Sequence, residues 1–246
     1  MQSTLKIDIR RRFCQLDVSY KKEKIMAQNL IFGISAAKIY TGIFQTLYMV
    51  GLSLLFGLII GLPLAVLLFV TRKGGIKQNL VVYNVVGTVI NVIRSVPFII
   101  LIVYIMPVTK IIVGTRVGST AALVPLVAYI APYLARLIEN ALLDVDNGII
   151  EAAQAMGATT LQAIFRFVLP ESLGSIVLGI TTGTVGLLGA TAMAGAVGGG
   201  GVGDLALTYG YQRFNFPLMT FTVIILIVFV QIIQMIGSNA AKKAKK

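Results

Sequence analysis

The chain has 246 residues, of which 57% are apolar and 12% are charged, and it contains no His and no Trp. This composition is typical of an integral membrane protein. The formal net charge is +12, but the basic residues lie in short stretches between apolar segments and at the ends of the chain. We therefore expect them to face lipid headgroups, and they argue against nucleic-acid binding.

The absence of His argues against hydrolytic and metal-dependent chemistry, because imidazole is the usual general base and metal ligand. The single cysteine, Cys14, excludes an internal disulfide and a multi-cysteine metal site. We expect no catalytic residue, no cofactor and no metal on this chain.

The first 25 residues are polar and basic, and they lack the apolar core of a signal peptide or of a membrane span. We interpret them as an extension upstream of a true start at Met26. The alternative is a disordered polar tail.

Five apolar segments are long enough to cross about 30 Å of hydrocarbon, which takes about 20 helical residues. Long uniform runs favour helices, and the alternating ten-residue segments of a β-barrel are not visible. The sequence therefore predicts an all-α transmembrane domain over residues 26–246. Five spans are few to surround a polar pathway, so we expect a symmetric dimer. The predicted spans cover about residues 40–70, 80–108, 118–141, 172–196 and 216–238.

The basic residues are distributed unevenly between the two sides of the membrane, as judged from the loop between the third and fourth spans, residues 144–171. Nine Lys and Arg residues share its side of the membrane and four lie on the opposite side, or eleven when the first 25 residues are counted. The first 25 residues therefore contradict the topology that the rest of the chain indicates. Without them, the excess of basic residues in cytoplasmic loops predicts that this loop and the C-terminus are cytoplasmic and that the N-terminus is outside.

This loop holds a polar, helix-compatible segment, EAAQAMGATTLQAIFRFVLP. Asn147-Gly148 has turn chemistry, residues 149–156 can form about two helical turns, and Gly157 can take the positive φ that ends a helix. The small Ala152 and Ala153 leave one face nearly smooth, so that another protein can approach the backbone. We expect this short helix to be held by packing on a partner.

A second short helix is predicted directly afterwards. Thr159 and Gln162 have the spacing of a capping box, and Pro170 predicts the point where that helix ends or kinks. Asp144 and Asp146, before the first helix, are interpreted as solvated turn residues.

Arg94 interrupts the second span, where a charge costs at least about 2.5 kcal/mol. Two interpretations remain open. Arg94 faces a central pathway and pairs with a carboxylate of the substrate or of the protein, or Pro97 breaks the helix there and Arg94 braces the freed carbonyls. Ser95, between these two residues, is a candidate for the same pathway. In the third span, Glu139 and Arg136 are spaced for an ion pair within one helix.

Glycines at 198–201, flanked by Gly195 and Gly203, are too many for a stable helix interior. We expect the fourth span to end or unwind there, either for close packing or gate flexibility or as a plain loop. Met193, Tyr209 and Tyr211 are candidates to border a solute pathway.

The run Glu151-Ala152-Ala153, with Gly157 and the pair Leu169-Pro170, resembles the EAA loop of ATP-binding-cassette importer permeases. In that family the loop carries a coupling helix that docks into a cleft on the ATPase subunit, and the resemblance implies this role for the six residues. The family usually has Ile three residues before the Pro, where this chain has Phe167.

Further stretches extend the resemblance. The segment Asn91-x-x-Arg94-Ser95-x-Pro97-Phe98 is similar to one shared by amino-acid importer permeases, and several later stretches resemble the permeases of methionine uptake systems. The resemblance implies the type I importer fold with five helices per subunit, two membrane subunits and two ATPase subunits. It also implies an external substrate-binding lipoprotein. These later stretches are residues 113–115, 131–132, 139–142 and 195–201.

The implied substrate is a small amino acid, methionine and its D-isomer by resemblance, moved by alternating access in the cell membrane. The chain has no GxxxxGK[ST] loop, so ATP and Mg are expected on the partner ATPase. A permease for another amino acid stays open. An integral-membrane enzyme and a self-sufficient channel are the alternatives from other classes.

Overall fold

A computed structural model describes residues 30–244. The predicted extension over residues 1–25 and Cys14 lie outside the described residues. The described chain is nearly all helical, which confirms the predicted fold class. It divides into two units, with the boundary between Thr41 and Gly42.

The first unit contains a feature that the sequence did not suggest. Strands β1 (Leu30–Ile31) and β2 (Ile34–Ser35) pair antiparallel, and Ile31 lies opposite Ile34. Phe32 and Gly33 join them with φ values of 52° and 81°. Two consecutive positive φ values are typical of a tight hairpin turn, so this short hairpin comes directly before the first long helix.

Among residues 30–244, four helices are long and apolar enough to cross a membrane, and a bent pair of shorter helices raises the number to five. The bent pair occupies the place of the expected second span, with an angle of 107° between its halves. The four are α2 (Ala36–Thr71), α5 (Ser119–Leu143), the continuous helix from Thr160 to Gly199 that contains α8 (Leu169–Ala194), and α10 (Phe216–Ala244); the pair is α3 (Leu80–Ser95) and α4 (Phe98–Val113).

The bend between α3 and α4 has a local cause at Pro97. Val96 leaves the helical region with a φ of −81° and a ψ of 123°, and Pro97 caps α4. Proline has no N–H for the helical ladder and disfavours helical geometry in the residue before it. The break that the sequence predicted at Pro97 is therefore present, and α4 runs almost at right angles to α3.

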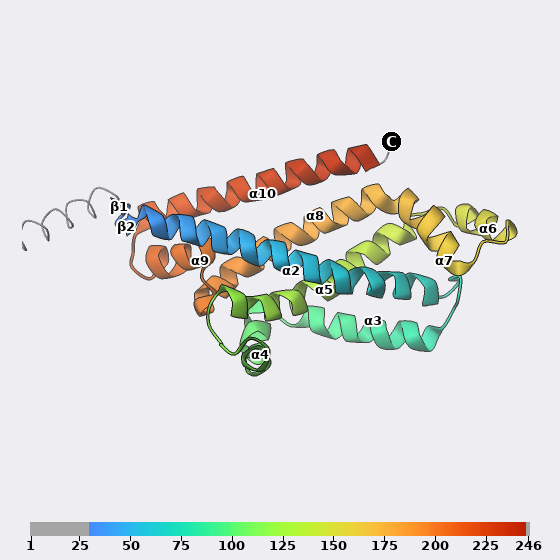
Figure 1. The fold of residues 1–246 in the computed structure, drawn as a ribbon, viewed down its shortest axis with the longest axis horizontal. Helices are drawn as coiled ribbons and strands as arrows, with labels where there is room; N and C mark the ends of the chain where they lie inside the picture. Colours follow the sequence, from blue (N-terminus) through green and yellow to red (C-terminus); the bar gives the residue numbers. More distant parts are fainter. Residues whose placement is uncertain (1–29, 245–246) are drawn as a thin grey trace, which may run out of the picture. The chain divides into compact units, whose positions relative to one another are not determined.

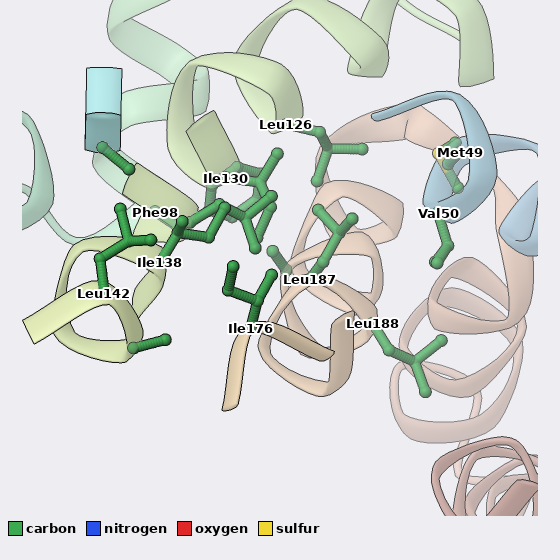
Figure 2. Packing of buried hydrophobic residues seen from close by; sticks show 14 of the residues in the cluster. Met49, Val50, Phe98, Leu126, Ile130, Ile138, Leu142, Ile176, Leu187 and Leu188 are labelled. Atoms are coloured by element: carbon green, nitrogen blue, oxygen red, sulfur yellow. The ribbon is translucent and has the colours of Figure 1, made fainter. Parts of the chain in front are cut away.

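The core of the second unit forms around α5. Five apolar side chains at four-residue intervals make one buried stripe along this helix, because residues i and i+4 share a helix face. Figure 2 shows the stripe meeting Ile176 and Leu187 of α8. The stripe consists of Leu126, Ile130, Leu134, Ile138 and Leu142, each with 0% exposure.

Glycines let α2 and α8 approach α5 closely. A Cβ at Gly57 would lie 2.5 Å from Ile130 Cγ2, and one at Gly61 would lie 2.8 Å from the Ala131 carbonyl oxygen. On α8, a Cβ at Gly183 would lie 2.7 Å from Leu134 Cδ2. Gly57 and Gly61 form a GxxxG pattern, which in membranes marks close helix packing.

The glycine-rich segment after α8 unwinds, as predicted. Within the π-helical turn η2 (Gly195–Gly199), Val197 and Gly198 have non-helical backbone angles. The chain then turns into α9 (Gly201–Asp204) and the π-helical η3 (Leu205–Tyr211).

Two side chains of α2 hold this turn in place. Gln45 Oε1 accepts a hydrogen bond from the Gly201 N–H at 2.9 Å, and Thr46 Oγ1 accepts one from the Val202 N–H at 2.9 Å. Gly201 is buried. The alternative of a plain loop is therefore wrong, because these buried amides replace their lost helical partners with side chains of α2.

Candidate functional site

The coupling segment, residues 144–171, connects α5 to α8. Its first helix, α6 (Asn147–Ala155), begins earlier than expected, because Asp146 caps it. The Asp146 carboxylate accepts a hydrogen bond from the Gly148 N–H at 2.6 Å. Asn147 and Gly148 therefore lie in the first helical turn and not in a preceding turn. Asp146 is exposed, as predicted, but it has a definite role as the N-cap.

The two alanines of the EAA motif face opposite ways. Ala153 has 0% exposure and Ile150 has 9%, and these two residues form the buried side of α6. Glu151 and Ala152 are exposed. Of the three residues of the motif, Glu151 and Ala152 are therefore available to another protein, while Ala153 allows α6 to pack closely on its own chain.

The end of α6 is a complete Schellman motif. Gly157 has a φ of 76°, as predicted. The Ala158 N–H donates to the Ala153 carbonyl at 3.0 Å, and the Gly157 N–H donates to the Gln154 carbonyl at 2.9 Å. These two bonds satisfy carbonyls that the helix leaves unpaired, and they turn the chain sharply toward the next helix.

The next helix, α7 (Thr160–Ala163), has the predicted capping box. The Gln162 side-chain oxygen accepts from the Thr159 N–H at 2.9 Å, and Thr159 Oγ1 accepts from the Gln162 N–H at 3.4 Å. The helix does not end at Pro170, however. It continues through the π-helical turn η1 (Ile164–Val168) into α8. The wider π turn accommodates a proline ring and its missing N–H without leaving the helical path.

The coupling segment also exposes large apolar side chains. Met156, Leu161 and Phe165 are 70%, 67% and 59% exposed. Figure 1 shows α6 and α7 at one end of the helical unit and α9 at the other. Sequence reasoning missed these three residues, although large apolar side chains in a polar segment were the available signal. We define the docking face as Glu151, Ala152, Met156, Leu161 and Phe165.

A contact with α2 holds the start of α6. Arg72, directly after α2, donates from Nη2 to the Asn147 side-chain oxygen at 3.4 Å, and its guanidinium lies 4.7 Å from the centre of the Phe69 ring. A cleft of about 350 Å³ lies between this region and α6, and Glu151 and Gln154 contribute to its wall. The start of α6 and the end of α2 are therefore in direct contact through Arg72 and Asn147.

At the other candidate site, Arg94 lies at the end of α3, directly before the bend. Its side chain is exposed, and its guanidinium lies 5.4 Å from the centre of the Tyr133 ring of α5. Within residues 30–244, Arg94 has no hydrogen bond and no ion pair. The prediction that Arg94 braces the carbonyls freed by Pro97 is therefore wrong, because a ring of α5 provides the contact instead.

Aromatic side chains of α5 extend this site beyond the predicted residues. Tyr129 and Tyr133 are stacked with ring centres 6.1 Å apart, and Phe98 meets Tyr129 edge to face at 5.2 Å. Phe98 is the first residue of α4, so the bend brings it against α5. The spacing of Tyr129 and Tyr133 by four residues was visible in the sequence, but nothing local indicated their pairing with Arg94.

The remaining pathway candidates lie in different surroundings. The Ser95 hydroxyl donates to the Asn91 carbonyl at 2.8 Å, and Pro97 is exposed at the start of α4. Met193 is 47% exposed near the end of α8. The guanidinium of Arg213 lies 4.6 Å from the centre of the Tyr209 ring, on the stretch before α10.

The predicted ion pair in α5 is confirmed. Arg136 Nη1 lies 2.7 Å from Glu139 Oε2, and Glu139 is only 1% exposed. Arg136 also donates from Nη2 to the Gly87 carbonyl at 3.2 Å, which ties α5 to α3.

These features are those of a membrane component with one specialised loop. They are a broken span, a capped helix pair between two long spans, and a buried helical core. The family of binding-protein-dependent transport system inner membrane components matches residues 53–244. The chain belongs to this family. Membership makes it a membrane-embedded transport component and not an enzyme.

Relatives of this transport component have similar length. The chain is 49% identical over 212 residues to a probable D-methionine transport system permease protein of Vibrio cholerae, covering 86% of this chain and 94% of the relative. It is 45% identical over 204 residues to a methionine import system permease protein of Bacillus subtilis, covering 83% of this chain and 92% of the relative.

Two solved structures share the fold of this transport component. An inward-facing form of the MetNI methionine ABC transporter has 42% identity and a TM-score of 0.84, covering 87% of this chain and 100% of that chain. An amino acid ABC transporter solved with histidines has 21% identity and a TM-score of 0.69, and this likeness concerns the fold alone. The match to the methionine transporter supports the predicted type I importer fold.

Proposed function

We propose that this chain is the permease subunit of an ATP-driven importer of methionine, including D-methionine. Two copies surround a pathway that opens alternately to the outside and to the cytoplasm. Two separate ATPase subunits bind ATP and Mg, so this chain carries no cofactor. An extracytoplasmic lipoprotein delivers the substrate.

The docking face is the observation that supports an ATPase partner in this proposal. Its helix is fixed by an N-cap at Asp146 and a Schellman motif at Gly157, and the same segment exposes Ala152 and three large apolar side chains. A rigid short helix with exposed Met156 and Phe165 is suited to the groove of another protein. Leu169 and Pro170 lie where the segment joins α8, so they transmit the movement into the membrane.

The orientation of the chain follows from the same partner. An ATPase that uses cellular ATP requires the coupling segment on the cytoplasmic side, which places Arg72, Lys73 and Lys77 there as well. The C-terminus is then cytoplasmic and the N-terminus lies outside, as the distribution of basic residues predicts.

Uptake of radiolabelled methionine tests the proposed substrate. The measurement uses a bacterial strain that lacks its own methionine importer and expresses this chain with its ATPase and binding protein. We expect ATP-dependent accumulation that unlabelled D-methionine reduces. Stronger competition by another small amino acid would favour the alternative importer, and absence of accumulation would contradict the proposal.

Substitution of Glu151 tests the docking face. We expect Glu151→Lys to reverse the exposed charge on α6 and to reduce copurification of the ATPase, while the level of the permease in the membrane stays unchanged. Asp144→Lys, at an exposed position outside α6, is the matched control. Full ATPase binding and stimulation in the Glu151 variant would count against docking at this face.

A further inference from the structure

The side chain of Arg94 has an unusual lack of polar partners for its position. If α3 begins at the cytoplasmic interface, fourteen residues from Leu80 to Arg94 place it about 21 Å into a hydrocarbon core about 30 Å thick. A guanidinium group has five N–H donors, and within the described chain it has one ring contact and no acceptor. A charge at this depth needs an acceptor from another molecule.

The contact with Tyr133 orients the group for such an acceptor. The guanidinium carbon lies 5.4 Å from the centre of the Tyr133 ring, and its forked N–H donors match a carboxylate with two parallel hydrogen bonds. The ring below Arg94 is itself held by Tyr129, with ring centres 6.1 Å apart. The pair of tyrosines therefore lies next to the cation at the bend.

The neighbouring surface suits an apolar side chain. Phe98 and Tyr129 form an edge-to-face pair beside the cation, and a Cβ at Gly186 of α8 would lie 3.8 Å from the Tyr129 hydroxyl. Aromatic rings make favourable contacts with aliphatic groups and with thioether sulfur. Arg94, the two tyrosines and Phe98 therefore form one cluster that offers a carboxylate partner next to an apolar surface.

We propose that Arg94, Tyr129, Tyr133 and Phe98 form a binding site in the membrane for the transported amino acid. Arg94 binds its carboxylate, and the aromatic rings contact its side chain. This inference rests on the proposed function, because it places the bend of α3 and α4 beside the pathway between two copies. It assigns the two tyrosines, which the sequence did not single out, to substrate specificity.

Transport by the complete system in proteoliposomes tests the site, with permease, ATPase and binding protein present. We expect Arg94→Gln to lower methionine uptake about 10- to 100-fold, the loss of a charged hydrogen-bonded pair. ATPase stimulation by the binding protein stays within about twofold. Arg94→Lys gives an intermediate loss, because it keeps the charge without the forked donors. Lys110→Gln, which removes another cation from the bent pair, leaves uptake unchanged.

A second measurement does not depend on variants. A methionine analogue with a diazirine in its side chain and a free carboxylate is cross-linked to the wild-type complex, and the labelled peptides are identified by mass spectrometry. We expect label on peptides containing Tyr129 or Tyr133, reduced by excess methionine but not by methionine amide, which lacks the carboxylate. If Arg94→Gln lowers folding and transport together, the labelling of the wild-type complex still tests whether the substrate binds at this site.

Two results would overturn the site. The first is normal uptake with Arg94→Gln, and the second is label elsewhere or equal competition by the amide. Absence of methionine uptake by the wild-type system would instead contradict the proposed function.

Discussion

At the scale of single residues, Glu139 and Arg136 form an ion pair within α5. Both charges lie inside a helix that is long enough to cross the membrane, and their separation of 2.7 Å lets each offset the desolvation of the other. The bond from Arg136 to the Gly87 carbonyl adds α3 to the same contact. This pair explains how α5 carries two charges within an apolar core.

Removing one member of this pair leaves the other unpaired in the core. We predict that Glu139→Ala destabilises the protein by about 3–5 kcal/mol, because Arg136 loses its counter-charge. The double variant Glu139→Leu with Arg136→Met should recover much of this loss. Thermal unfolding of the purified permease in detergent measures both, with the exposed Asp144→Asn as control. Equal stability of the single and wild-type proteins would contradict a stabilising pair.

At the scale of elements, α2 and α8 approach α5 at glycines, and the atoms that face these glycines differ in how far they can move. The Cβ of an alanine at position 61 would meet the Ala131 carbonyl oxygen at 2.8 Å, which is backbone. At position 183 it would meet the Leu134 Cδ2 at 2.7 Å, the far end of a side chain. The two distances are similar, but alanine at position 61 is therefore expected to lower the stability of the protein more than alanine at position 183.

We predict that Gly61→Ala lowers thermal stability by about 1–3 kcal/mol, the cost of overpacking. Gly183→Ala should cost clearly less, because Leu134 can change rotamer. Gly51→Ala, where no atom lies within 4 Å of the new Cβ, should be neutral or slightly stabilising. Unfolding midpoints of the three variants test the order, and a larger loss at Gly183 than at Gly61 would refute it.

The turn after α6 is the second element whose geometry leads to a prediction. We expect Gly157→Ala to strain the Schellman motif by about 1–2 kcal/mol, because its φ of 76° suits only glycine well. The amount of methionine imported per ATP hydrolysed should fall, since the docking face is no longer held at one angle. Gly157→Asn, which tolerates this φ better, should retain more coupling. An unchanged ratio in the alanine variant would show that the turn does not control coupling.

At the scale of the whole molecule, the basic loop after α2 and the coupling segment must share one side of the membrane, because Arg72 is bonded to Asn147. With Cys14 replaced by Ser, single cysteines report this arrangement. We predict that Lys73→Cys and Gln154→Cys react with a membrane-impermeant thiol reagent only from the cytoplasmic side. Arg116→Cys should react only from outside. Labelling of Gln154→Cys from outside would invert the proposed orientation.

The sequence predicted the features that depend on short stretches of chain. The length of each apolar run limits the number of spans, and the caps at Gly157 and Thr159 are set by hydrogen bonds between residues a few positions apart. The break at Pro97 has the same local origin, since proline acts on its own and the preceding residue. These features followed from the covalent neighbours alone.

Tertiary structure decided which faces meet. It turned Ala153 inward and left Met156 exposed, placed Tyr133 beneath Arg94, and continued the helix past Pro170 through a π turn. The arrangement of these features depends on how helices distant in the sequence pack together. In a chain whose spans are apolar on every side, no residue pattern specifies which face packs on protein and which faces lipid, so only the packed helices could settle it.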